Sequence, residues 1–125
     1  MLATRERFEN IKAWQAAREL VSAVYRVSRR GKFEKDFGLR DQIQRASVSV
    51  MANIAEGFER SSDRDFHRFL YIAKGSAGEV LSHLFVALDL GYVTSDEFDD
   101  LRAKAEDVAK ALSGFITYLA SKDPM

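Results

Sequence analysis

The stretch from Gln42 to Arg60, QIQRASVSVMANIAEGFER, constrains the fold more than any other part of the chain. At 100° per residue, its apolar residues fall on one helical stripe, and a second stripe beside it is polar. The apolar stripe contains Leu39, Ile43, Ala46, Val50, Ile54 and Gly57. The polar stripe, called here the polar file, contains Gln42, Arg45, Ser49, Asn53, Glu56 and Arg60. This double periodicity predicts one long helix with ordered polar groups next to its core-facing side.

The rest of the chain favours helices as well. The only proline is Pro124, so no earlier position forbids a long helix. Apolar periodicity predicts helices at about residues 8–30, 39–57, 63–90 and 95–121, within one domain spanning 1–125. Ser62 with Asp65, and Thr94 with Glu97, have the spacing of capping boxes at two helix starts. Short links between four helices predict an all-α, up-down-up-down antiparallel four-helix bundle.

Two of the predicted helices have more apolar surface than one bundle core requires. The surplus is Leu20 and Val27 in the first helix, and Ile72, Val86 and Leu90 in the third. Exposed apolar patches of this kind usually mark an interface. Two different surplus faces suit a head-to-tail contact between copies, which closes into a ring when the rotation permits. We therefore expect these five residues to form an oligomer interface.

Composition limits the environment and the chemistry. Cysteine is absent, which excludes disulfides and thiolate chemistry. MLATRERF lacks the apolar run of a signal peptide, and the uncharged run from Ala46 to Ala55 is about half a membrane span. We expect a cytoplasmic protein without a membrane partner. Residues 1–64 contain 13 Lys/Arg against 9 Asp/Glu, a net charge of +4, whereas residues 65–125 contain 6 against 10, a net charge of −4.

A basic cluster near the end of the first helix is the candidate RNA-binding surface. It consists of Arg26, Arg29, Arg30, Lys32 and Lys35. Phe33 and Phe37 are interleaved with it and could stack on bases, since aromatic rings beside cations bind unpaired nucleotides. The alternative is that the two rings plug one end of the bundle core and the charges are simply solvated.

The polar file predicts a structural network. Glu56 and Arg60 are four residues apart in the favourable order for an ion pair. Arg45 is too far along the helix to reach Glu56, and Glu79 on another helix is its expected partner. Asn53 borders the core and should hydrogen-bond across the bundle or to a neighbouring copy, because an unpaired buried amide is costly. A network that fixes helix register is the favoured interpretation, and a ligand site is the alternative.

The sequence shows no constellation typical of catalysis or metal binding. Its two histidines, His67 and His83, lack the Glu-x-x-His spacing of di-iron bundles. The serines at 47, 49 and 76 lie in predicted helices without a suitably placed histidine, and no phosphate-binding loop is present. We expect no catalytic residue, no cofactor and no metal, and we do not expect an enzyme.

Several blocks of sequence resemble one known family. They are Trp14-Gln15-x-Ala17-Arg18-Glu19-Leu20, Gly38-Leu39-x-x-Gln42-Ile43-x-Arg45-Ala46, Ser49-Val50-x-x-Asn53-Ile54-Ala55-Glu56-Gly57, Phe69-Leu70-x-Ile72-Ala73-x-Gly75-Ser76 with Glu79, and Leu90-Gly91-Tyr92. In this order they cover nearly the whole chain and are similar to the four-helix bundle proteins encoded in intervening sequences of bacterial 23S rRNA genes. Two features depart from that pattern: Met51 stands where similar sequences commonly have proline, and the charged connection after the first helix has no proline.

The resemblance implies a four-helix bundle that assembles as a ring of five, with no established enzymatic activity. A related group of basic pentameric bundles accompanies retroelement reverse transcriptases and engages nucleic acid, which implies RNA as a partner by analogy. Two hypotheses follow. The protein is a non-enzymatic, self-assembling bundle that binds structured or ribosomal RNA, or it is an adaptor or scaffold that binds a protein partner.

Overall fold

The computed structural model describes residues 7–122, and every element within them is helical. A short 3-10 helix, η1 (Phe8–Asn10), precedes α1 (Lys12–Ser28) and the short α2 (Gly31–Lys35). Three long helices follow: α3 (Phe37–Phe58), α4 (Asp63–Asp89) and α5 (Ser95–Lys122). The fold is an all-α bundle built on α1, α3, α4 and α5.

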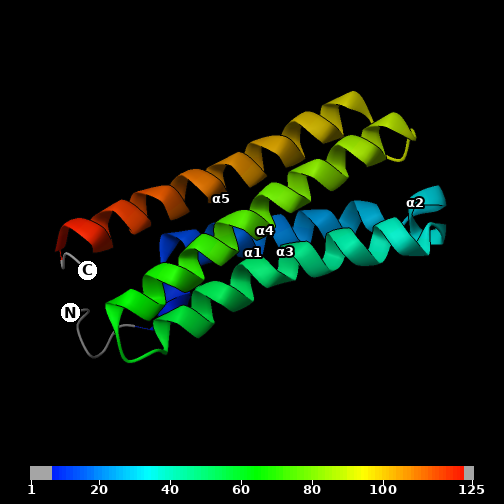
Figure 1. Cartoon of the computed structure of the whole chain (residues 1–125). Helices are drawn as coiled ribbons and strands as arrows, with labels where there is room; N and C mark the ends of the chain where they lie inside the picture. The colour runs from blue at the N-terminus through cyan, green and yellow to red at the C-terminus, as the bar shows by residue number, and fades with distance from the viewer. Residues whose placement is uncertain (1–6, 123–125) are drawn as a thin grey trace.

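The four long helices alternate in direction (Figure 1). Each packs against two neighbours, in the order α1, α3, α4, α5 and back to α1. The α4–α5 turn and α2 lie at one end of the bundle, while the α3–α4 turn, the start of α1 and the end of α5 lie at the other (Figure 1). Short connections between consecutive antiparallel helices produce this arrangement.

The first predicted helix is divided in the structure. The sequence predicted one helix from about Phe8 to Arg30, but Ile11 has an extended backbone, with φ −76° and ψ 124°, and it separates η1 from α1. At the other end, Gly31 has a φ of +57°, a left-handed conformation that glycine adopts without strain. Because this conformation interrupts the helix after α1, the charged connection forms the separate helix α2. Helix α3 continues without interruption through Met51.

Side-chain and backbone caps define the ends of α4 and the start of α5. The Ser62 hydroxyl accepts a 3.1 Å hydrogen bond from the Asp65 backbone N–H. At the C-terminus of α4, Gly91 has a φ of +75°, and its N–H and that of Tyr92 donate to the carbonyls of Leu88 and Ala87. This pattern is a Schellman motif, which satisfies carbonyls that the helix itself leaves without donors.

The core lies between the four long helices and is almost entirely apolar. Its largest fully buried side chains include Leu20, Ile54, Leu70, Leu84 and Leu112. Two serines are also buried. Ser28 accepts a 2.9 Å hydrogen bond from the Gln44 amide, and Ser47 donates to the Gln44 carbonyl at 2.9 Å. In the described residues, no buried side-chain nitrogen or oxygen lacks a hydrogen-bond partner.

At Gly57, α3 and α4 lie close together. A Cβ at this position would lie 2.7 Å from Phe69 Cβ and 2.9 Å from Phe66 Cδ1. The glycine is therefore required by packing, although its backbone is ordinary helix. Gly75 and Gly78 differ: a Cβ at either would meet no atom within 4 Å. No helix of the described chain packs closely against either glycine.

The proposed interface residues on α1 are wrong. Leu20 is fully buried in the subunit core, and Val27 is only 6% exposed. The physical reason is that α1 packs against both α3 and α5. The two apolar faces of α1 each cover one neighbour, so neither is surplus. Neither residue is accessible to another copy of the chain.

Candidate nucleic-acid interface and polar file

The basic cluster lies at the end of the bundle that includes α2. Arg26 is on the last turn of α1, Arg29 and Arg30 lie in the connection, and Lys32 and Lys35 are on α2. All five side chains are exposed. Among the ion pairs of residues 7–122, only Arg30 of this set takes part. The short helix α2 thus places several cations on one end of the molecule.

The two aromatic residues of this segment have different environments. Phe33 is fully buried and stacks on Tyr92, with ring centroids 5.2 Å apart. Phe37 is 65% exposed, and the Arg40 guanidinium lies 4.8 Å from its ring centroid. The expectation that both rings plug the bundle end is therefore correct for Phe33 and wrong for Phe37. Only Phe37 is available to stack on a base.

Arg30 is part of a cap rather than a free cation. Its guanidinium donates a 2.6 Å hydrogen bond to the Glu97 carboxylate. The same carboxylate accepts from the Thr94 backbone N–H at 2.9 Å, while the Thr94 hydroxyl accepts from the Glu97 N–H at 3.1 Å. The pKa of Glu97 lies below its usual value, chiefly because of the bond from the Thr94 N–H and next because of the bond from Arg30. Arg30 therefore stabilises the start of α5.

A second unexpected contact fixes this end of the bundle. Asp36 caps α3 by accepting a 3.2 Å hydrogen bond from the Leu39 N–H, and its other oxygen accepts a 2.9 Å bond from the Tyr92 hydroxyl. The bond to Asp36 raises the pKa of Tyr92 above its usual value. Asp36 thus connects the start of α3 to the α4–α5 turn. This contact between distant parts of the chain fixes the start of α3, which directly follows α2.

A groove of about 510 Å³ runs beside the basic cluster. It lies between α1 and α3 and is lined by Val21, Ser22, Tyr25, Arg26, Arg29 and Val48. Tyr25 is half-buried, whereas both arginines are exposed. The groove therefore combines two guanidinium groups, two hydroxyl groups and an aromatic ring on one surface.

The polar file is only partly a connected network. The Asn53 amide donates to the Ser49 carbonyl at 2.8 Å and to the Ser49 hydroxyl at 2.9 Å. Ser49 and Ser76 hydroxyls lie 3.1 Å apart, which links α3 to α4. Arg60 and Glu56 form the expected ion pair at 3.0 Å. Sequence reasoning placed Ser76 in a helix but missed its role here, because no local spacing relates residues on different helices.

The expected ion pair between Arg45 and Glu79 does not form. Glu79 instead lies 3.2 Å from the His83 ring nitrogen, on its own helix. Arg45 is exposed, as is Gln42 at the start of the file. The cause is local: a residue four positions along one helix reaches Glu79 at little entropic cost, whereas Arg45 lies on another helix.

Helix α4 has an exposed apolar face. Ile72, Val86 and Leu90 are 41%, 42% and 53% exposed. They recur at helical spacing, and Gly75, with open space above it, lies on the same side. Unlike Leu20 and Val27, these residues are accessible to a partner.

Each of the two histidines contacts a neighbour on its own helix, α4. His67 packs edge-on against Tyr71, and His83 contacts Glu79. Within residues 7–122, no group of three or more His, Cys, Asp or Glu side chains could hold a metal ion. None of the helices in that range is long and apolar enough to cross a membrane.

Comparisons with known proteins identify the class. The chain is similar to a crystal structure of a protein of unknown function from the S23 ribosomal protein family of Bacteroides thetaiotaomicron. The TM-score is 0.76 and the identity 24%, over 83% of this chain and 97% of the other, so the likeness concerns the fold. The family model of the 23S rRNA-intervening sequence protein matches residues 9–114. The chain therefore belongs to the 23S rRNA-intervening sequence protein family. No curated protein matches it.

Proposed function

We propose that this protein is a non-catalytic, self-assembling bundle that binds structured RNA through the basic cluster. The observation that supports this most strongly is the exposure of Arg26, Arg29, Lys32 and Lys35 at one end of the bundle. Cations with no ion pair in the described chain remain available to phosphates, and each neutralised phosphate releases counterions. The link of the family to 23S rRNA genes agrees with RNA as the polyanion.

The surroundings of the cluster favour RNA with unpaired nucleotides. Phe37 is exposed beside the cluster, and Tyr25 lies in the adjoining groove with Arg26 and Arg29. Aromatic rings beside cations accept splayed bases, whereas the bases of a continuous duplex are not available for stacking. A stem with a loop or bulge therefore suits this end of the bundle better than a plain duplex.

Charge reversal at the cluster tests this proposal. Arg30 must be left unchanged, because a glutamate there would face Glu97. The test variant is therefore Arg29→Glu, Lys32→Glu, Lys35→Glu, and we expect it to bind a stem-loop RNA at least tenfold more weakly than wild type. The matched control, Lys12→Glu, Lys74→Glu, Lys110→Glu, has the same net charge and should lose far less affinity. Equal losses in both variants would mean that no local surface is involved.

Self-assembly rests on the exposed apolar face of α4. Ile72, Val86 and Leu90 form the corrected interface, without the buried residues of α1. The resemblance implies a ring of five subunits. Such a ring would bring five basic clusters together, and this would strengthen binding to any RNA that spans several of them.

Light scattering should show an oligomer. The double variant Ile72→Glu, Val86→Glu should dissociate it, whereas Tyr118→Glu, at an exposed position on α5, should leave it intact. A wild-type monomer at micromolar concentration would refute this.

The same apolar face supports a second candidate function, an adaptor that binds a protein partner. The two functions differ in their dependence on salt, because apolar contacts weaken little as ionic strength rises. Failure of the wild-type protein to bind RNA even at low salt would favour the adaptor.

We also propose that the protein is not an enzyme. In support, the Ser47 hydroxyl donates a hydrogen bond to a carbonyl of its own helix, and the Ser49 hydroxyl bonds to that of Ser76.

A further inference from the structure

We propose that an apolar cavity at the end of the bundle opposite the basic cluster binds a small amphipathic carboxylate, with its alkyl chain in the cavity and its carboxylate at Lys12. The cavity has a volume of about 350 Å³. In the part of the chain that the structure describes, its lining comes from the η1–α1 junction (Asn10, Ile11, Lys12, Ala13), the end of α3 (Phe58) and α5 (Ala111, Phe115). Ligand pockets of proteins start at about 300 Å³, so the cavity suits a small ligand.

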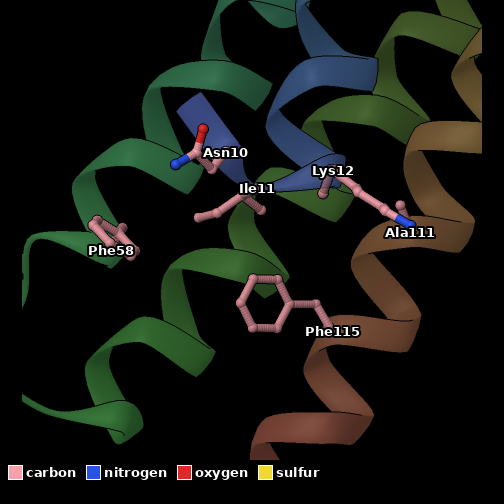
Figure 2. A pocket seen from close by; sticks show the side chains of 7 residues that line it. Asn10, Ile11, Lys12, Phe58, Ala111 and Phe115 are labelled. Carbon is pink, nitrogen blue, oxygen red and sulfur yellow. The ribbon is translucent and has the colours of Figure 1, made fainter. Parts of the chain in front are cut away.

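The shape of the cavity separates an apolar part from a cationic edge (Figure 2). The Ile11 side chain and the Phe115 ring face each other, and Phe58 closes one side. Lys12 extends in the other direction and ends beside Ala111 on α5 (Figure 2). A chain lying between Ile11 and Phe115 would therefore bring its head group to the lysine.

The charge of the lining selects the head group. Within residues 7–122, Lys12 is the only charged residue that lines the cavity, and it is exposed and takes part in no ion pair there. It is also the first residue of α1, where the positive end of the helix dipole adds to its field. An anion gains a charge-assisted hydrogen bond here, whereas a cation would be repelled by the lysine.

The apolar walls select the tail. Burying one methylene group contributes about 0.8 kcal/mol, which corresponds to roughly fourfold in affinity. Affinity should therefore rise from hexanoate to octanoate to decanoate, and level off once the cavity is full. This inference does not depend on RNA binding, because the cavity and the basic cluster are at opposite ends of the bundle.

The experiment is calorimetric titration of the full chain with decanoate, and with decylammonium and decanol as probes of the same length. We expect saturable binding of decanoate, weaker binding of decanol and none of decylammonium. Lys12→Gln should weaken decanoate binding by roughly tenfold, while Lys110→Gln, on the exposed side of α5, should not. Ala111→Phe should fill the cavity and abolish binding, and Ala111→Leu provides a milder test if the larger side chain impairs folding.

Three results would overturn the proposal. Wild-type protein that binds no decanoate would remove the site, and binding unchanged in both Lys12→Gln and Ala111→Leu would place it elsewhere. Decanol binding as tightly as decanoate would exclude a role for the charge.

Discussion

Replacing Gly57 by alanine tests the packing of α3 on α4 directly. Helix propensity alone predicts stabilisation, since alanine is favoured over glycine by up to about 1 kcal/mol in a helix interior. The structure predicts the opposite. The new Cβ would lie 2.7 Å from Phe69 Cβ and 2.9 Å from Phe66 Cδ1. Phe69 Cβ is attached to the α4 backbone, so α4 itself must move.

The magnitude follows from two opposing contributions. Overpacking a tight core contact costs about 1–3 kcal/mol. The propensity gain is below its interior value, because Gly57 is the penultimate residue of α3. We therefore expect Gly57→Ala to destabilise the protein by about 1–2 kcal/mol. At about 2.1 cal/mol/K per residue for the entropy of unfolding, this lowers Tm by roughly 4–8 °C.

Thermal denaturation followed by circular dichroism measures the effect, at one fixed protein concentration because assembly also affects Tm. The matched control is Gly78→Ala on the exposed side of α4, where a Cβ meets nothing within 4 Å. There only propensity acts, and Tm should rise by roughly 2–4 °C. A Gly57→Ala variant as stable as wild type, or more stable, would refute the packing argument.

Three further predictions concern polar contacts. Asn53→Ala should lower stability by about 1 kcal/mol or change the oligomer size, because the half-buried bonds to Ser49 are lost; a variant unchanged in melting and light scattering would revive the ligand-site alternative for the polar file. The lowered pKa of Glu97 means that its stabilising contribution is present above pH 4.5 and is lost as the pH falls through the folded-state pKa, so Glu97→Gln should show a smaller loss of Tm on acidification than wild type. The raised pKa of Tyr92 has the opposite sign: its contribution is present below pH 10 and is lost as the pH rises through the folded-state pKa, so Tyr92→Phe should show a smaller alkaline loss of Tm than wild type. Identical pH profiles in wild type and variant would contradict either linkage.

Features with a local sequence signal could be predicted. The capping pairs at Ser62 and Thr94 depend on residues three positions apart. Thr94 and Glu97 form both hydrogen bonds of a capping box, whereas Ser62 and Asp65 form one of the two. The ion pair of Glu56 with Arg60 is likewise local. Helical periodicity also identified the all-α class, because it repeats over many turns.

Features that depend on the relative placement of helices could not be predicted. Periodicity showed that α1 has two apolar faces, but it could not show that α3 and α5 cover both, so Leu20 and Val27 were misplaced. The link of Ser49 to Ser76 and that of Asp36 to Tyr92 join residues far apart in sequence. The apolar cavity at Lys12 depends on Ile11 leaving helical geometry, which no pattern in the sequence indicated.

The salt dependence of RNA binding shows whether the basic cluster contacts phosphate groups. We would measure the affinity of wild type for a stem-loop RNA between 50 and 200 mM salt (roughly the range over which phosphate contacts dominate) and repeat the titration with Arg29→Glu, Lys32→Glu, Lys35→Glu. Each phosphate contact adds about 0.7–0.9 to the slope of log affinity against log salt. We predict that the variant loses about two units of slope or more, whereas the Lys12→Glu, Lys74→Glu, Lys110→Glu control keeps the wild-type slope. Equal slopes in wild type and the cluster variant would contradict it.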